Sequence, residues 1–252
     1  MKSRFVRIGV VLLGSLLIAS LAHADEDWPS WLPGDTPVSE VGVQGSTMNI
    51  DADALFAASA SVSYDDNSVT FLDGSMMMAS MWEWTWEKII LDPDPSVDFV
   101  GDFTNLNAGA QNFVFSIVTP VAPPLPSSLY GGSTSVTIGD TGTNGATLAN
   151  APGQPGYAGT IDGGSQLLLL NPFSLSAPPG GTNGKTEWNG MYATIPGPAV
   201  NTSIGIVHEF NLTGLDNATF NSTFHVIPEL GTFALLASGL CGLALLGRRR
   251  QT

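Results

Sequence analysis

Short runs in which apolar and polar residues alternate dominate the middle of the chain. The clearest run covers positions 76–90. Its even positions carry a stripe of tryptophans: Trp82, Trp84 and Trp86. Lys88 and Ile90 continue the even positions, and the acidic residues of the run fall at odd ones. Because side chains alternate between the two faces of a strand, the run predicts one long strand with the tryptophans on one face and the acids on the other.

Further runs of this kind predict more strands along the chain. They cover 41–50, 55–64, 69–72, Phe113–Val118, Ile204–Leu212 and Phe220–Val226. Turn residues separate them, as in the Asp-Pro-Asp-Pro sequence at 92–95, and the Gly, Asn and Thr-rich segment 139–164 is either one long loop or two strands with wide turns. Many short strands at this spacing predict an all-β fold, an antiparallel β-sandwich of jelly-roll type.

The N-terminus has the order of features that defines a secretory signal peptide. Lys2, Arg4 and Arg7 precede an apolar run from Ile8 to Leu21, and small residues follow at Ala22 and Ala24. This order predicts export, with cleavage after Ala24. Residues 1–24 are therefore interpreted as the signal peptide and residues 25–40 as an irregular leader.

An uncharged apolar segment lies near the other end of the chain, at 231–247, and is followed by three arginines: Arg248, Arg249 and Arg250. A length of about 17 apolar residues is the lower limit for a transmembrane helix. The positive-inside rule then places the arginines in the cytoplasm and the preceding part of the chain outside. The sequence thus predicts a single C-terminal transmembrane helix behind a β-sandwich ectodomain at 41–225.

Pro228 and Glu229, the apolar segment and the arginine cluster together resemble the PEP-CTERM sorting signal of Gram-negative bacteria. Leu230 stands where that family has a second proline. The same type of tail is also catalogued as an ice-binding protein C-terminal domain, a label that implies no ice binding. The resemblance covers residues 226–252 and implies an exosortase-type processing enzyme as a partner.

Charge divides the targeting ends from the part of the chain that is exported. The chain has a formal net charge of −14, yet between Asp25 and Glu229 only Lys88 and Lys185 are basic. Because that segment holds every acidic residue, its charge is about −20. Such a surface repels nucleic acid, which excludes that class of partner. The one cysteine, Cys241, lies in the apolar tail, so the ectodomain must be stabilised by its core rather than by disulfides.

Catalytic chemistry has little support in the sequence. No Gly-x-Ser-x-Gly elbow, His-Glu-x-x-His helix or phosphate loop occurs. His208 falls on the apolar side of its run, which favours a buried core residue over a catalytic base. We expect a protein without enzymatic activity and without an obligatory cofactor.

Calcium is the metal that the acidic turns would suit. Asp140 and Asn144 place oxygen donors at alternating positions ahead of Gly145, and Asp92, Asp94 and Asp98 form a second candidate cluster. The residues at 65–67 form a third. Asp and Asn are also frequent in turns on backbone grounds alone, so an ordinary turn is the alternative at each position.

The tryptophan stripe has two interpretations as well. On an exposed face, Trp82, Trp84 and Trp86 would form a stacking platform for carbohydrate. On a buried face they would form the core, because each ring buries a large area. We expect the core.

These features together predict an exported structural or binding protein at the cell surface or in the extracellular matrix, associated with polysaccharide and with the membrane through its tail. The alternative is a lectin-like or carbohydrate-active jelly roll that the same tail delivers.

Overall fold

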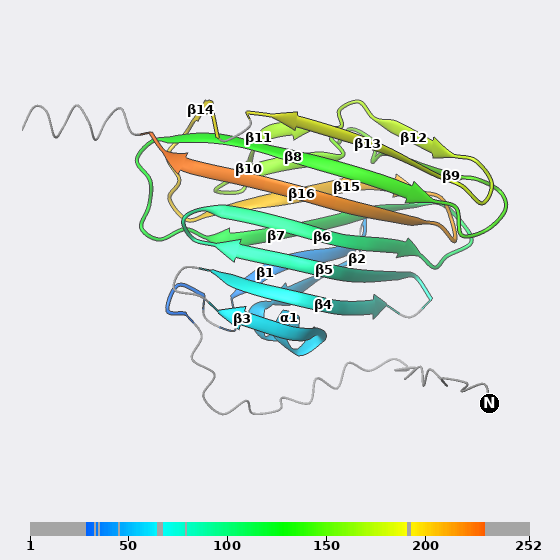
Figure 1. Ribbon diagram of the computed structural model, residues 1–252, viewed down its shortest axis with the longest axis horizontal. Coiled ribbons are helices and arrows are strands. Elements are labelled where there is room, and N and C mark those ends of the chain that lie inside the picture. Colours follow the sequence, from blue (N-terminus) through cyan, green and yellow to red (C-terminus); the bar gives the residue numbers. More distant parts are fainter. Residues whose placement is uncertain are drawn as a thin grey trace, which may run out of the picture.

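Two antiparallel sheets packed face to face make up the part of the protein that the structure describes (Figure 1). The computed structural model describes residues 29–229, except 33, 35, 45, 65–67, 79, 191 and 192. The predicted signal peptide with Ala22 and Ala24, the predicted transmembrane segment and Arg248, Arg249 and Arg250 lie outside the described residues. Within them the prediction of an antiparallel β-sandwich is confirmed.

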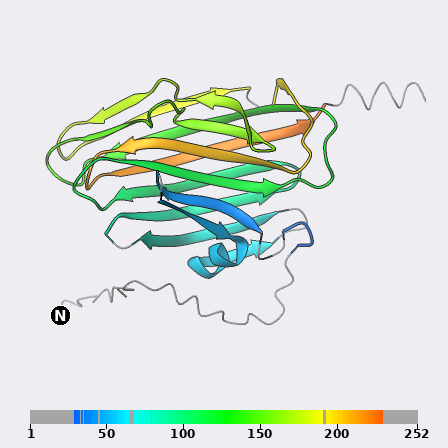
Figure 2. The same ribbon diagram turned by 180° about the vertical axis from the view of Figure 1, so that it is seen from behind.

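Sheet A is the rear layer of Figure 1 and the front layer of Figure 2. Its central order is β11-β10-β15-β7-β1-β2, with β9 on β15 and β12 on β9. The strands are β1 (Pro37–Val43), β2 (Ser46–Asp51), β7 (Gln111–Pro120), β9 (Ala146–Asn150), β10 (Tyr157–Ile161), β11 (Gly164–Leu169), β12 (Ser174–Ala177) and β15 (Ser203–Leu212). Strand β1 starts inside the segment expected to be an irregular leader.

Sheet B is the front layer of Figure 1 and has the order β13-β8-β16-β6-β5-β4-β3, with β14 on β8. Its strands are β3 (Ser59–Tyr64), β4 (Val69–Met78), β5 (Trp82–Asp92), β6 (Ser96–Asn105), β8 (Ser128–Gly139), β13 (Thr182–Asn189), β14 (Ile195–Gly197) and β16 (Asn217–Pro228). One helix, α1 (Ala52–Ala58), connects the sheets, and the Asp51 carboxylate caps it by accepting the Ala54 N–H at 2.8 Å.

Aromatic rings from both sheets fill the space between them. Trp84 of sheet B and Phe115 of sheet A have ring centroids 5.1 Å apart, and Phe103 and Phe210 meet edge to face at 5.6 Å. These rings are at most 1% exposed. As predicted, the odd positions of 113–117 and the even positions of 204–212 face this core.

Three of the predicted strands are interrupted in the structure. The run 76–90 is the hairpin β4–β5, in which Ser80 has a φ of 59° and the Met81 N–H donates to the Met78 carbonyl at 2.9 Å. The run 41–50 is the hairpin β1–β2, and 55–64 is most of α1 followed by β3. Segment 139–164 contains two strands, β9 and β10, which was one of its two interpretations.

A β-bulge changes the phase of the tryptophan strand. Trp86 pairs with Gly101 and Lys88 with Val100, so Glu87 is an extra residue between them. After the bulge the odd positions face inward, and Ile89 is fully buried. The prediction that Lys88 and Ile90 share the tryptophan face is therefore wrong.

A chain of hydrogen bonds joins the two sheets within the core. The Nδ1–H of His208 donates to the Gly156 carbonyl at 2.8 Å, and Nε2 accepts from the Ser222 hydroxyl at 3.0 Å. Ser222 in turn lies 2.8 Å from the Thr134 hydroxyl. His208 is fully buried, and this burial lowers its pKa to about 4. The expectation of a hydrogen-bonded core histidine is confirmed.

Acid should destabilise the fold through His208. Its pKa is lower in the folded protein than in the unfolded chain, so the unfolded chain binds the extra proton as the pH falls below about 6.5. The free energy of unfolding should then decrease by about 3 kcal/mol between pH 7 and pH 4 on account of this residue. Urea unfolding across that range, compared with His208→Gln, measures the contribution. Parallel pH profiles for the two proteins would contradict it.

Removal of the central indole should damage the core severely. Trp84→Ala deletes a fully buried ring that contacts both sheets and should cost about 3–5 kcal/mol in urea unfolding. Trp188→Ala is the matched control, because Trp188 is 61% exposed. A loss of similar size in both variants would show that the core does not depend on Trp84.

Candidate binding face on sheet B

The tryptophan stripe is part of the core and is not a binding surface. Trp82 and Trp84 are 0% exposed and Trp86 is 2% exposed. All three belong to the core cluster, and Phe115 of sheet A lies against the Trp84 ring at a centroid distance of 5.1 Å. A sugar ring cannot reach them, so the alternative of a stacking platform at these positions is wrong, and the expectation of a core is confirmed.

Asp140 organises the loop that follows β8. Its carboxylate accepts backbone N–H bonds from Gly142 at 2.9 Å, Gly145 at 3.1 Å and Gly180 at 2.7 Å. The bond from Gly180 is the main cause that lowers the pKa of Asp140. Asn144 is exposed in the same loop. These three backbone N–H groups fix the conformation of the glycine- and asparagine-containing loop around Asp140.

The second calcium candidate has the geometry of a turn. Asp92 ends β5, and its carboxylate accepts the Asp94 N–H at 2.8 Å. Across the residues that the structure describes, no three His, Cys, Asp or Glu side chains converge on a metal position. The third candidate, at 65–67, lies outside those residues.

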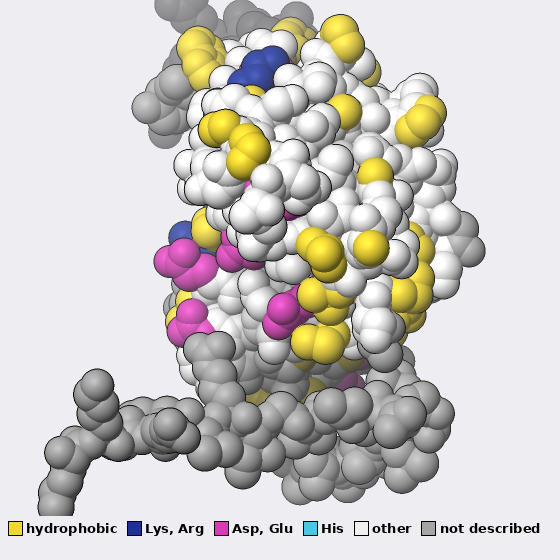
Figure 3. All heavy atoms as spheres, turned by 90° about the vertical axis from the view of Figure 1, so that its right-hand side faces the viewer, with side chains coloured by type: hydrophobic (Ala, Val, Ile, Leu, Met, Phe, Trp, Pro, Cys, Tyr) yellow, Lys and Arg dark blue, Asp and Glu magenta, His cyan; other side chains and the backbone are white. Residues whose placement is uncertain are grey.

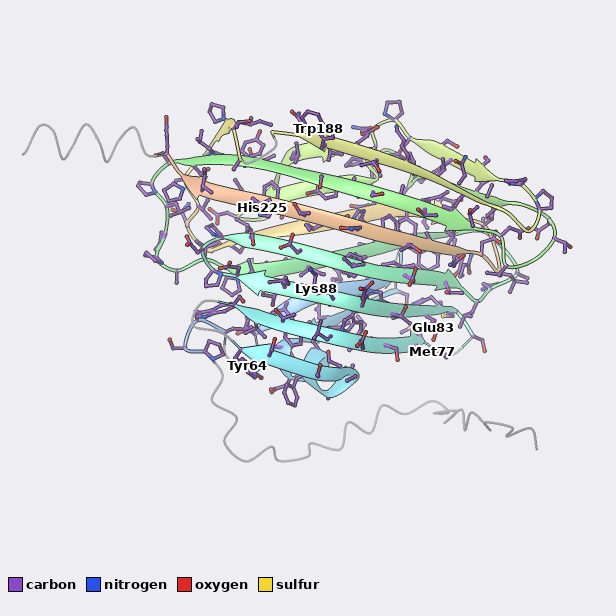
Figure 4. The ribbon with its side chains drawn as sticks, in the orientation of Figure 1. Tyr64, Met77, Glu83, Lys88, Trp188 and His225 are labelled. Carbon is purple, nitrogen blue, oxygen red and sulfur yellow. The ribbon has the colours of Figure 1, made fainter. Side chains whose placement is uncertain are left out.

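The side of sheet B that faces away from sheet A, here called the outer face, carries the polar half of the strand alternation. Figure 4 labels Trp188, His225, Lys88, Glu83 and Met77 over this sheet. Seen from the end where β8 stops, the acidic side chains gather mainly on the side of the outer face (Figure 3). Much of the remaining surface in that view is neither charged nor apolar.

Strand register aligns an indole with three polar side chains across the outer face. Trp188 of β13 pairs with Ser133 of β8, Ser133 pairs with Thr223 of β16, and Thr223 pairs with Asp98 of β6. We call these four residues the Trp188 row. Because neighbouring strands lie about 4.8 Å apart, the row extends for about 14 Å. It combines one exposed ring with two hydroxyls and a carboxyl.

Parallel rows beside it add more hydrogen-bonding groups. The next row contains Thr186, Ser135 and Asn221, and the Thr186 hydroxyl donates to Ser135 at 3.0 Å. The row after that contains Thr219 and Asp102, which are hydrogen bonded to each other. The outer face near β13 thus offers a flat array of donors and acceptors.

Asp98 is the carboxyl at the far end of the Trp188 row. Partial burial raises its pKa, and the nearby His225 and Lys88 oppose this effect. His225 lies on the same face, with Nε2 2.9 Å from the Thr223 hydroxyl. Asp98 therefore sits among groups that donate hydrogen bonds, where a ligand hydroxyl would find both a donor and an acceptor.

The carboxyls of this face have limited scope for acid–base chemistry. Asp98 and Asp102 are four residues apart on one strand, which separates them by about 13 Å. That distance exceeds the spacing of a glycosidase pair. Glu83 and Asp102 are diagonal neighbours across β5 and β6, with Cα atoms roughly 7–8 Å apart, and Asp102 already accepts a bond from Thr219.

Trp188 is the residue that the sequence reasoning missed. It stands in a segment rich in Gly, Thr and Asn, and its neighbours two positions away are Thr186 and Gly190. A core strand would carry apolar residues at those positions. The sequence signal for an exposed tryptophan is therefore that its neighbours on the same face of the strand are not apolar.

The first two residues of the predicted sorting signal continue the sheet. Pro228 is the last residue of β16 and pairs with Ser128, and the Glu229 N–H donates to the Ser127 carbonyl at 3.4 Å. Among the described residues no helix is long and apolar enough to span a bilayer.

Comparison with known proteins yields distant structural similarity. The chain matches no protein-family model and no curated protein. It is similar to the carbohydrate-binding module TmCBM61 in complex with β-1,4-galactotriose, at 13% identity and a TM-score of 0.27 over 52% of this chain and 71% of that chain. A cyclase from Fischerella sp. TAU in complex with 4-(1H-indol-3-yl)butan-2-one is similar at 10% identity and a TM-score of 0.28, over 67% and 88%. At these scores neither similarity carries an argument about function.

Proposed function

We propose that this is an exported, non-enzymatic protein of the cell surface or extracellular matrix, which holds polysaccharide on the outer face of sheet B. The observation that carries the proposal is the Trp188 row, with its indole 61% exposed beside Ser133, Thr223 and Asp98. Sugar rings present apolar C–H faces that pack on indoles, and their hydroxyls need donors and acceptors at the periphery. A flat row about 14 Å long accommodates several sugar units.

The negative charge of the protein limits the kinds of polysaccharide that can bind to it. The segment from Asp25 to Glu229 has two lysines and every acidic residue of the chain. Of the two lysines, Lys185 is paired with Glu187. An acidic polysaccharide would meet repulsion on this surface. Neutral or amine-bearing polysaccharides fit it better.

The delivery of the protein is the second part of the proposal. The signal peptide at 1–24 would export the chain, and the PEP-CTERM-like tail with its transmembrane helix would hold it until an exosortase-type enzyme acts. Strands that alternate between sheets, such as β6, β7 and β8, support a jelly-roll arrangement for the exported part. Because Pro228 ends β16, cleavage close behind it would release a complete sandwich.

Mutation of the exposed indole should weaken polysaccharide binding. Trp188→Ala should reduce affinity about tenfold, since an exposed aromatic anchor is worth about 1.4 kcal/mol. Affinity electrophoresis in gels containing β-glucan, galactan or mannan measures the change, with alginate as the acidic comparison.

Met77→Ala is the matched control, because Met77 is 63% exposed on β4, at the opposite side of sheet B. Equal retardation of wild type and Trp188→Ala in every gel would remove the outer face as the binding site. Release of reducing ends from a bound polysaccharide would favour the carbohydrate-active alternative, and Glu83→Gln would then test the Glu83–Asp102 pair.

Processing of the tail should depend on the sorting residues. In cells that contain an exosortase, the wild-type protein should lose mass at its C-terminus, and Glu229→Ala should remain unprocessed in the membrane fraction. Mass spectrometry of the two proteins makes the comparison. An identical mass for the wild type in cells with and without the enzyme would reduce the tail to an anchor.

A further inference from the structure

Two carboxyl groups from different loops meet at the end of the sandwich where β8 stops and β16 begins. Asp140 directly follows β8, and Asp216 directly precedes β16. The residues beside them, Gly139 and Asn217, are a cross-strand pair, which brings the two loops together. Asp140 and Asp216 are thus the first residues beyond a paired position, and they lie opposite each other at the same end of sheet B.

Asp216 is buried and incompletely bonded. Its side chain is 0% exposed, and its Oδ2 accepts the Thr213 hydroxyl at 2.5 Å. Its Oδ1 is buried and has no hydrogen-bond partner. A buried carboxylate oxygen without a partner is costly, and a proton, an ordered water or a cation beside it would satisfy it.

Asp140 has one site left for such a partner. A carboxylate offers about four lone-pair sites, and three are taken by the N–H groups of Gly142, Gly145 and Gly180. Two of those bonds go to Oδ2, so the remaining capacity lies on Oδ1. This oxygen and the unpartnered Oδ1 of Asp216 are the two that a cation would join.

Neutral oxygen donors surround the pair. The Asn144 Oδ1 lies close to Gly142, where an added Cβ would come within 2.8 Å of it and 3.3 Å of the Asp140 Oδ1. The Leu215 carbonyl is bonded by the Thr141 hydroxyl in the same loop pair. The loop is exposed at Thr141 and Asn144, so water can complete a coordination shell.

No basic residue in the described part of the chain balances the two carboxyls. Lys185 is paired with Glu187, and Lys88 lies near Asp98. The negative charge of the two carboxyls therefore has no basic side chain beside it, and a bound cation would balance it.

We propose that Asp140 and Asp216 bind a Ca²⁺ ion between them, with the Asn144 amide oxygen and water as further ligands. Hard oxygen donors with two carboxylates suit Ca²⁺, and extracellular modules bind it at about 10⁻⁴–10⁻³ M. The ion joins the β8–β9 loop to the β15–β16 turn and so clamps that end of the sandwich. The site is remote from Trp188 along the strands, and it stands or falls independently of polysaccharide binding.

Thermal unfolding of the purified full-length protein in EDTA and in 10 mM CaCl₂ tests the site. Ca²⁺ should raise the Tm of the wild type by about 4 °C. Asp216→Asn should abolish the increase, because it removes the second charge and keeps the shape of the side chain. Asp73→Asn is the control: it makes the same charge change at an exposed position of β4 and should retain the increase.

Two results would overturn the proposal. One is an absence of any Tm change in the wild type at 10 mM Ca²⁺, together with an Asp216→Asn protein of equal or higher stability, which would assign a shared proton to the pair. The other is an equal increase in the wild type and Asp216→Asn, which would show that Ca²⁺ acts on the overall negative charge. Isothermal titration of both proteins with Ca²⁺ separates the site from such screening.

Discussion

Burial of aromatic rings between the two sheets is the interaction on which the rest of this structure depends. With no cysteine between the predicted signal peptide and the tail, no disulfide can restrain the unfolded form of that segment, and the core must supply the stability. Trp84 is at the centre of it, in contact with rings from its own sheet and from the opposite one. Because the alternation of each strand directs these rings inward, it also leaves the outer face of sheet B to hydroxyl, amide and carboxyl groups.

The fold and the faces of its strands follow from the sequence because they depend on local periodicity. The inward orientation of Phe113, Phe115 and Ile117 needs only a period of two, and so does the burial of the tryptophans. The ends of the strands depend on turns, and turns are harder to predict from the sequence. The turn between β4 and β5 contains no glycine or proline that would mark it in the sequence. Ser80 takes the positive φ there instead. The bulge at Glu87 has no distinctive sequence signal either, since it is set by the pairing of β5 with β6.

In the candidate sites, too, some features follow from local sequence and others depend on how distant strands pair. Asp140 was recognisable as an oxygen donor in a loop, and it does organise that loop. Its partner Asp216 is 76 positions further along the chain, and only the pairing of β8 with β16 brings the two together. The Trp188 row likewise takes its members from four strands that are not consecutive in sequence. Long-range register decides both sites, and a single sequence does not encode that register in any short motif.

The scarcity of lysine and arginine between Asp25 and Glu229 has a consequence for the resistance of the fold to proteolysis. Proteases of the trypsin type cut only after those residues, and the chain offers them Lys88 and Lys185 between Asp25 and Glu229. Both lie within hydrogen-bonded strands. Lys88 is in β5, which has a neighbouring strand on each side, and Lys185 is in β13. A protease must pull β5 away from two neighbouring strands to reach the bond after Lys88, and only Lys185 lies on an edge strand. The composition that gives the protein its negative charge therefore also gives it a backbone with almost no cleavage points for this class of enzyme.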